Sequence, residues 1–273
     1  MQRIIDYYRY LNLLSVDVAV GAAVSALFLT KVFKVEVRPQ GYICLGLTVW
    51  LIYTLDHLVD AKMLKGEAST KRHRFHQQYF KPIGLMSLLI SLTILPLLFL
   101  IYTPVLSMGA GLGVLVVVYF IVQRKLGFLK EVLGALLYCI GVMLPVIALS
   151  EKSFNSLLSV TTILFFNTAL INLVLFSWFD RDKDMKDNHS SLVTSVGGTA
   201  SKGILCLLFV LQLGLIVYAF SSVDASVLVV FASMYLVLVL IFIKDQWFAL
   251  EDRYRLAGDA VFLIPLIYVV YHC

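Results

Sequence analysis

Long apolar runs separated by short polar intervals organise the whole chain. Each run has roughly 18 to 22 residues, enough for an α-helix to cross a hydrocarbon core about 30 Å thick. The pattern predicts nine membrane-spanning helices, at residues 13–30, 42–58, 83–101, 105–122, 132–149, 157–179, 203–220, 225–243 and 256–271. Because these spans leave no room for a separate soluble unit, we expect one all-α membrane domain over residues 1–273.

Composition agrees with this class of protein. The chain is 60% hydrophobic and 14% charged, whereas soluble domains are about a quarter charged. The N-terminal segment does not resemble a cleavable signal, because Asp6, Asn12 and Asp17 interrupt its apolar stretch, so we expect it to stay attached. The four cysteines include no C-x-x-C pair, which argues against a zinc site or a disulfide framework.

Basic residues are distributed unevenly along the predicted spans. With nine spans, the N-terminus and the loops after the second, fourth, sixth and eighth spans share one side of the membrane. All of the 22 lysines and arginines lie on that side except Lys31, Lys34, Arg38 and Lys152. The positive-inside rule places this side in the cytoplasm. We therefore interpret the net charge of +5 as topology rather than as a nucleic-acid surface, and expect a multi-pass protein of a bacterial inner membrane with a cytoplasmic active site.

An acidic cluster ends the sixth predicted span on the cytoplasmic side. Four aspartates occur within eight residues, namely Asp180, Asp182, Asp184 and Asp187. If the helix of the sixth span continues through them, Asn172, Asp180 and Asp184 share one stripe and Asp182 faces the other way. We predict that this stripe faces the site, with Asn172 among the substrate contacts.

A smaller acidic cluster ends the second predicted span on the same side. The sequence DHLVD places Asp56 and Asp60 at i and i+4, on one face of a helix. Tyr53 precedes them by three and seven positions, so its ring is predicted to lie on the same face, where it can stabilise a substrate cation.

Carboxylates in this arrangement suit a hard divalent cation. Mg²⁺ takes one or two protein carboxylates and completes its octahedron with waters and substrate phosphate oxygens. Basic side chains near the clusters are expected to contact the remaining phosphate charge. These predicted phosphate contacts are Lys71, Arg72, Arg74, Arg181, Lys186 and His189. A diphosphate with a lipid tail fits both the charged mouth and the apolar bundle, so membrane lipid and a lipophilic partner are expected neighbours.

The second cluster has two other interpretations. Its D-x-D-x-D start is shared with EF-hand calcium loops, but the sixth position is Met185 instead of Gly and the twelfth is Ser191 instead of Glu. The aspartates could also be a solvated helix end that pairs with neighbouring Lys and Arg. Two clusters on one side make that second interpretation less favourable, although it stays open.

On these motifs and spans, almost the whole chain resembles the UbiA-type intramembrane prenyltransferase superfamily. The second cluster, DRDKDMK at residues 180–186, is close to that family's D-R-D-x-D-x-K form. The resemblance implies nine helices around a central cavity, with Mg²⁺ and a prenyl diphosphate bound at its mouth. It also implies that Asp56 and Asp60 approach Asp180 and Asp184 there, as catalytic metal ligands, and that Arg181 and Lys186 contact the diphosphate or its loop.

The first cluster departs from the family pattern N-D-x-x-D-x-x-x-D. Ile52 and Tyr53 stand in its first two places, which removes an amide and a carboxylate. The basic stretch STKRHRF does follow, at residues 69–75. Asn12, Asp17 and Asp259 lie within predicted spans, and such polar residues are candidates for the cavity or for interhelical hydrogen bonds.

The resemblance implies an enzyme that transfers a prenyl group from a prenyl diphosphate to a lipophilic or aromatic acceptor. The missing residues of the first cluster leave a terpene cyclase open as an alternative, in which the substrate's own double bond traps the cation. A non-catalytic lipid-binding protein is the other alternative. A transporter is disfavoured, because both clusters lie on one face and few charges lie near mid-membrane.

Overall fold

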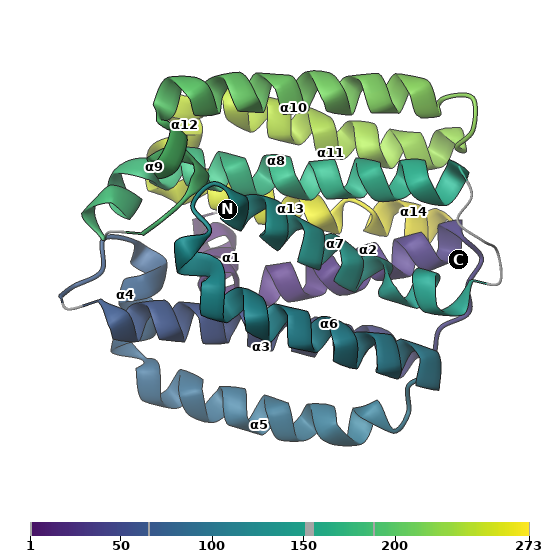
Figure 1. Cartoon of the computed structure of the whole chain (residues 1–273), viewed down its shortest axis with the longest axis horizontal. Coiled ribbons are helices and arrows are strands. Elements are labelled where there is room, and N and C mark those ends of the chain that lie inside the picture. Colours follow the sequence, from purple (N-terminus) through teal and green to yellow (C-terminus); the bar gives the residue numbers. More distant parts are fainter. Residues whose placement is uncertain (1, 65, 151–155, 188, 273) are drawn as a thin grey trace.

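The computed structural model describes residues 2–64, 66–150, 156–187 and 189–272. Within these ranges every regular element is a helix, and the long helices run side by side (Figure 1). The α-helices are α1 Gln2–Leu13, α2 Val16–Val32, α3 Pro39–Met63, α4 Lys71–Gln78, α5 Phe80–Leu98, α6 Thr103–Val122, α7 Leu129–Leu149, α8 Ser156–Lys186, α9 Leu192–Val196, α10 Gly198–Ala219, α11 Ala225–Ile243, α12 Asp245–Ala249, α13 Arg253–Ala260 and α14 Leu266–Tyr271. Three short 3₁₀ helices are η1 Gln123–Lys125, η2 Leu250–Asp252 and η3 Val261–Leu263.

The described helices have the length and apolarity of membrane spans. Eight described helical segments are each long and apolar enough to cross a membrane. The bent pair Asp6–Leu13 and Val16–Val32 makes a ninth if the pair is counted as one span. Large apolar side chains on the outside, such as Val114, Val117 and Ile121 of α6, are exposed. An exposed apolar surface of this extent suits lipid rather than water. The protein is an integral, multi-pass membrane protein, and the predicted all-α bundle is confirmed.

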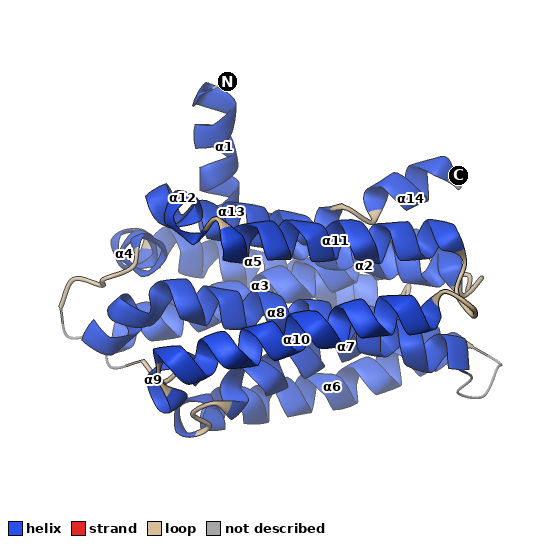
Figure 2. Cartoon of the chain, turned by 90° about the horizontal axis from the view of Figure 1, so that it is seen from above, coloured by secondary structure: helices blue, strands red, loops and turns tan. Residues whose placement is uncertain are grey.

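The first span differs from the single helix predicted for residues 13–30. Ser15 has a positive φ of 56°, and α1 meets α2 there at an angle of 80°. The break turns Asn12 inward, where its amide donates to Asp17 at 2.6 Å and to Asp259 at 2.7 Å. The hydrogen bonds that the Asn12 amide gives to two buried carboxylates stabilise the structure more than an unbroken helix would. As a result, α1 projects away from the bundle (Figure 2).

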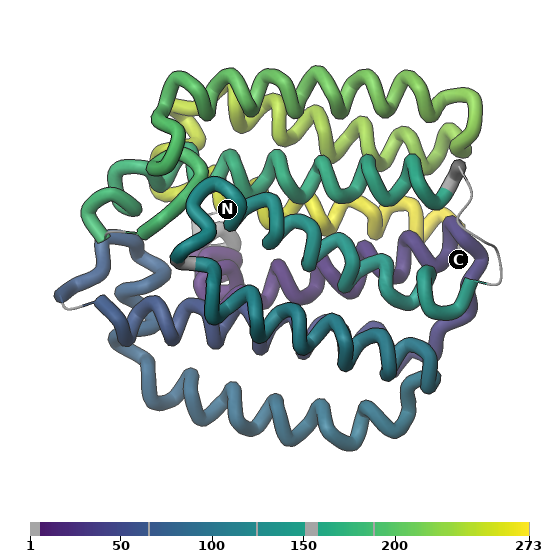
Figure 3. Tube along the Cα trace, in the orientation of Figure 1, coloured from purple at the N-terminus to yellow at the C-terminus, as the bar shows by residue number. Residues whose placement is uncertain are grey.

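The ninth span also differs from the helix predicted for residues 256–271. Glu251 and Asp252 both have positive φ, at 57° and 59°, and α13 begins directly after them. The helix then passes through η3 and Pro265 before α14 starts. A proline has no backbone N–H to donate, which explains a break at this point. The broken span packs along α2, so the first and the last span of the chain lie side by side (Figure 3).

The centre of the bundle is α8. In its most apolar window 72% of the residues are buried, the highest share among the spans. An aromatic cluster packs beside it, in which the ring of Phe262 lies 5.2 Å from that of Tyr138 and 5.8 Å from that of Phe165. This cluster joins α7, α8 and η3, so the last span is held against the central helix.

Close packing at Gly258 sets how near α13 comes to α8. A Cβ built on Gly258 would lie 2.4 Å from Asn172 Oδ1 and 2.6 Å from Phe176 Cε1. Since real atoms do not approach so closely, only glycine fits. The backbone of α13 therefore touches α8 one to two turns before the second acidic cluster.

We expect Gly258→Ala to destabilise the protein by about 1–3 kcal/mol, because the added methyl group overpacks this contact. The matched control is Gly214→Ala in α10, where a Cβ meets nothing within 4 Å. Alanine there should leave stability unchanged or slightly higher. Thermal unfolding of both variants in detergent measures the difference. Equal melting temperatures would contradict the close approach of α13 and α8.

Candidate functional site

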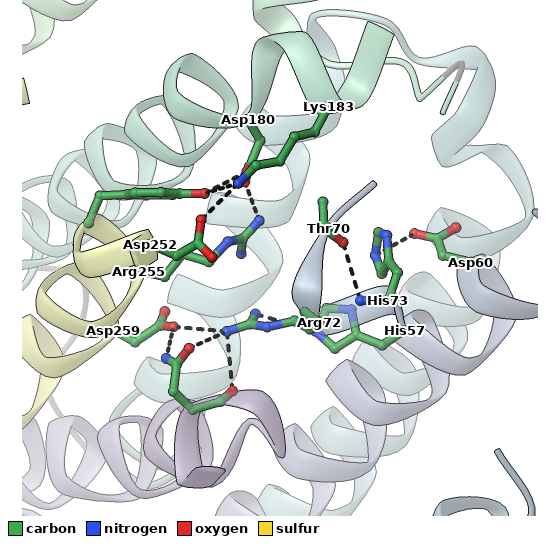
Figure 4. Close-up of polar contacts among 12 residues, drawn as sticks. His57, Asp60, Thr70, Arg72, His73, Asp180, Lys183, Asp252, Arg255 and Asp259 are labelled. Carbon is green, nitrogen blue, oxygen red and sulfur yellow. Dashed lines mark hydrogen bonds and ion pairs between the residues drawn. The ribbon is translucent and has the colours of Figure 1, made fainter. Parts of the chain in front are cut away.

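Polar side chains from four helices gather at one end of the bundle. They come from the C-terminal ends of α3 and α8, from α4 and from α13 (Figure 4). The helix α8 continues without a break through Lys186, which confirms the helix predicted through the second cluster. Asp180 is buried, Asp184 is half-buried and Asp182 is exposed, as the helical stripe predicts.

Asp180 lies at the centre of a charged network. It accepts hydrogen bonds from Arg255, from the Tyr254 hydroxyl at 2.5 Å and from Lys183 Nζ at 3.0 Å. Lys183 also donates to Asp252 at 2.8 Å. Two cationic side chains therefore balance the buried Asp180 carboxylate. A buried charge is tolerable only when it is paired in this way.

Asp184 lies one helical turn beyond Asp180, near the start of α7. Its carboxylate lies within electrostatic reach of Lys130, Arg255 and Asp180. Proximity of two carboxylates is unfavourable unless cations are shared between them. The pair therefore provides donor atoms for an additional cation.

The first cluster lies at the end of α3. Asp56 accepts a hydrogen bond of 2.9 Å from Gln123 Nε2, and the buried Asp60 lies 3.9 Å from His73 Nε2. Asp60 also borders a polar cavity of about 100 Å³. The other lining residues of this cavity are Met63, Leu64, Gln123, Lys130, Asp187, His189 and Ser190.

Shared neighbours connect the two clusters. Lys130 borders the same cavity as Asp60 and lies within reach of Asp184. His73, beside Asp60, lies within electrostatic reach of Arg255, which in turn pairs with Asp180. The structure thus brings Asp60 and the α8 aspartates to the same end of the bundle through these neighbours.

The two histidines of α4 have lowered pKa values and are neutral near pH 7. Burial lowers the pKa of His73 to about 4, although the nearby Asp60 carboxylate works in the opposite direction. Burial also lowers the pKa of His76, whose Nδ1 lies 2.9 Å from the Arg72 carbonyl oxygen. These imidazoles therefore act as hydrogen-bonding or ligating groups rather than as fixed positive charges.

Arg72 lies in a buried polar network. One guanidinium nitrogen donates to Asn12 Oδ1 at 2.9 Å and lies 3.4 Å from Asp259 Oδ2, and the other is 3.4 Å from His57 Nε2. Asn12 joins Asp259 to Asp17 in the same network. The structure therefore ties Arg72 to α1 and α13, and Arg72, predicted as a phosphate contact, does not line the polar cavity.

The other basic residues expected at the site lie nearer the surface. Lys71 is 3.6 Å from Asp252, and Arg74 pairs with Glu67 at 3.2 Å on an exposed edge. Arg181 and Lys186 are exposed on α8, away from the buried Asp180, and neither lines the described cavity. Of this expected set, His189 is the one that the structure places at the cavity lining.

Two expected contacts lie deeper in the bundle. Asn172 is buried beneath Gly258, and its Oδ1 has no hydrogen-bond partner among the described residues. Tyr53 is half-buried one turn below Asp56, and its ring is 6.4 Å from that of His57. Both therefore lie on the inner side of the acidic clusters.

Several site residues were missed by sequence reasoning. Arg255 had a readable signal, because it precedes the intramembrane Asp259 by four positions and so shares a helix face with it. Tyr254 and Asp252 belong to the same segment. Gln123 and Lys130 carried no local signal, since they reach the site from η1 and from the first turn of α7.

A second cavity lies on the outer side of α3. It has a volume of about 430 Å³ and an apolar surface. Residues of α2, α3 and α5, with Leu14 between α1 and α2, form its wall, including Ala19, Gly46, Trp50 and Ile90. This groove is chemically suited to a lipid chain.

Comparisons with known proteins agree with the fold. No protein-family model and no curated protein matches the sequence. The apo structure of a UbiA homolog from Aeropyrum pernix K1 matches with a TM-score of 0.66 at 14% identity, over 96% of this chain and 97% of that one. A UbiA homolog from Archaeoglobus fulgidus matches with TM-scores of 0.63 when bound to DMAPP and Mg²⁺, and 0.64 when bound to GPP and Mg²⁺. These matches have 12% and 13% identity and cover 96% of this chain and 99% of those. The chain has the UbiA-type fold.

Proposed function

We propose that this protein is a Mg²⁺-dependent enzyme of the prenyltransferase type. It binds a prenyl diphosphate at the polar end of the bundle and transfers the prenyl group to a lipophilic or aromatic acceptor within the membrane. The observation that carries the proposal is that Asp60 of α3 and the aspartates of α8 lie at the same end of the bundle, where Arg255 and Lys183 pair with Asp180. The A. fulgidus homolog of the same fold, bound to prenyl diphosphates and Mg²⁺, supports the ligand class.

The donor atoms present fit Mg²⁺. Asp56, Asp60, Asp180 and Asp184 offer carboxylate oxygens from two helices, which is the hard donor chemistry that this ion selects. When bound, Mg²⁺ supplies positive charge to a departing diphosphate. Asp60 and Asp180 are buried, which strengthens electrostatic interactions at the site.

Substrate binding requires Asp180 to exchange partners. Its carboxylate is now balanced by Arg255 and Lys183. Once Asp180 takes part in cation binding, these two side chains are released to donate to phosphate oxygens. Guanidinium groups bind phosphate in a bidentate geometry, so Arg255 is suited to hold the leaving group. In the free protein, Asp180 thus holds Arg255 and Lys183 close to the place where the diphosphate would bind.

The prenyl chain would extend from this end into apolar surroundings. Loss of diphosphate leaves an allylic cation, and the half-buried Tyr53 ring lies one turn below Asp56, where its face can stabilise that charge. The apolar bundle excludes water that would otherwise trap the cation. The apolar groove beside α3 offers further room for an isoprenoid or acceptor chain.

One departure favours a second candidate, a terpene cyclase on the same scaffold. Ile52 and Tyr53 replace the amide and carboxylate expected at the start of the first cluster. Fewer ligands and an added aromatic ring suit a reaction in which the substrate's own double bond traps the cation. The two candidates differ only in what attacks the cation, so product analysis separates them.

The test is diphosphate release by the purified protein. We expect Mg²⁺-dependent release from DMAPP or GPP, with a prenylated product that forms only when a lipophilic acceptor is added. Release with a cyclic product in the absence of acceptor would support the cyclase instead. No release from any prenyl diphosphate, with or without acceptors, would contradict an enzymatic function. A non-catalytic lipid-binding protein would then be the remaining alternative.

The same assay in vesicles tests orientation. The excess of basic residues on one side supports a cytoplasmic position for the site, in a bacterial inner membrane. Inverted vesicles should therefore turn over externally added GPP, because its charged headgroup does not cross the bilayer. Turnover in right-side-out vesicles alone would show that the site faces the other side of the membrane and would contradict the predicted orientation.

A further inference from the structure

Three side chains outside the four proposed Mg²⁺ ligands come together over the polar cavity. His73, Asp187 and His189 each offer one ligand atom, and these atoms lie within 4.8 Å of one another. All three side chains are half-buried. Asp187 and His189 line the polar cavity, and the His73 ring lies 5.5 Å from the His189 ring.

Local hydrogen bonds fix the backbone of the two histidines and the side chain of Asp187. Thr70 caps α4 by accepting from the backbone N–H of His73 at 3.2 Å. Asp187 accepts from the backbone N–H of Ser69 at 3.0 Å and from its hydroxyl at 2.7 Å. The backbone N–H of His189 donates to the Asp184 carbonyl at 2.8 Å, at the end of α8. The cluster is therefore positioned by one helix cap, by the Ser69–Asp187 hydrogen bonds and by the end of α8.

We propose that His73, Asp187 and His189 bind a divalent transition-metal ion such as Zn²⁺. Two imidazole nitrogens and one carboxylate oxygen are a donor set for zinc or cobalt, whereas Mg²⁺ prefers oxygen alone. Metal–ligand bonds of 2.0–2.1 Å in a tetrahedron place donor atoms about 3.3 Å apart. The present spacing of up to 4.8 Å closes to that value with a modest inward movement of the three side chains. A water completes the coordination.

The ion would fasten two segments across the mouth of the proposed active site. His73 belongs to the segment that follows α3, and Asp187 and His189 to the segment that follows α8. In the present structure the hydrogen bonds from Ser69 to Asp187 join them. A metal ion at this place would keep the two segments together over the polar cavity. The site therefore has a role beyond the proposed reaction, which is to control access of substrate to the cavity.

Metal titration tests this site without any prenyl substrate. The full-length protein, purified without a polyhistidine tag and stripped with chelator, is titrated with Co²⁺ in excess Mg²⁺ while its visible absorption is followed. We expect one Co²⁺ per chain, displaced by Zn²⁺ and not by Mg²⁺. His73→Ala and His189→Ala should each weaken binding at least about tenfold. Ser69→Ala, which removes a hydrogen bond to Asp187, should weaken it by about tenfold as well.

Two controls separate this site from others. His272 is exposed and directly follows α14, which lies at the opposite end of the bundle from α4 (Figure 1), so His272→Ala should bind Co²⁺ as the unmodified protein does. Asp180→Asn should keep Co²⁺ binding even though it loses turnover, which distinguishes failure of this site from failure of the proposed function. The Co²⁺-induced rise in melting temperature is read for each variant, so a destabilised variant remains informative. The proposal is overturned if the unmodified protein binds no Co²⁺ in excess Mg²⁺, or if both histidine variants bind it unchanged.

Discussion

Asp180→Asn is expected to reduce diphosphate release by at least about a thousandfold, or roughly 4 kcal/mol in the activation free energy. Asp180 is the buried carboxylate on which Arg255, Lys183 and Tyr254 converge. Asparagine keeps the size of the side chain but removes the charge that the proposed metal and these cations need. Initial rates at saturating Mg²⁺ and GPP measure the effect.

The matched control for Asp180 lies two residues away. Asp182 is exposed on the opposite face of α8, so Asp182→Asn should change the rate by less than about tenfold, or 1.4 kcal/mol. Asp184→Asn and Asp60→Asn should fall near Asp180→Asn, since each removes a proposed metal ligand. Wild-type turnover in Asp180→Asn would end the metal assignment. Equal losses of turnover at Asp180 and Asp182 would show that function does not depend on the buried face of α8 in particular.

Arg72→Met is expected to destabilise the protein by about 3–5 kcal/mol, because it leaves the buried Asp259 carboxylate without its guanidinium partner. Methionine preserves much of the apolar volume of the side chain, so loss of charge dominates. Unfolding of detergent-solubilised protein measures the change in stability. Arg74→Met, two residues along the same helix, should cost less than about 0.5 kcal/mol, since Arg74 is exposed.

A double substitution tests the physical reason. If the penalty of Arg72→Met arises from an unpaired carboxylate, then Arg72→Met combined with Asp259→Asn should recover part of the lost stability. Additive losses in the double variant would show that Arg72 acts through packing rather than through charge.

Local periodicity was enough to predict much of the bundle. The spans between residues 42 and 243 match helices of the structure because each is a single apolar run with polar ends. The continuation of α8 through Asp180 and Asp184 was also predicted, since the carboxylates follow the helical stripe of the preceding apolar run. The UbiA-type fold expected from these motifs is confirmed by the solved structures.

Long-range pairing explains what sequence reasoning missed. The break at Ser15 exists because Asn12 meets Asp259, a partner 247 positions away that no local window contains. Arg72 was read as a phosphate contact from its place in a basic stretch, and the same distant pairing draws it into the protein interior. Arg255 was counted for topology alone, although its bond to Asp180 makes it central to the site. The partners of a buried charge are set by the packing of the helices and not by distance along the chain. The role of such a residue can therefore be assigned only when the packing is known.

The central claim is that α3 and α8 together hold one diphosphate through Mg²⁺. An experimental structure with Mg²⁺ and a non-hydrolysable prenyl thiodiphosphate tests it most directly. We predict metal ions with bonds of about 2.0–2.1 Å to carboxylate oxygens of Asp56 or Asp60 on one side and Asp180 or Asp184 on the other. Arg255 should have left Asp180 and should donate to the diphosphate. A diphosphate bound through basic residues alone, or carboxylate pairs more than about 15 Å apart, would contradict the account, because metal bonds of this length cannot span that gap.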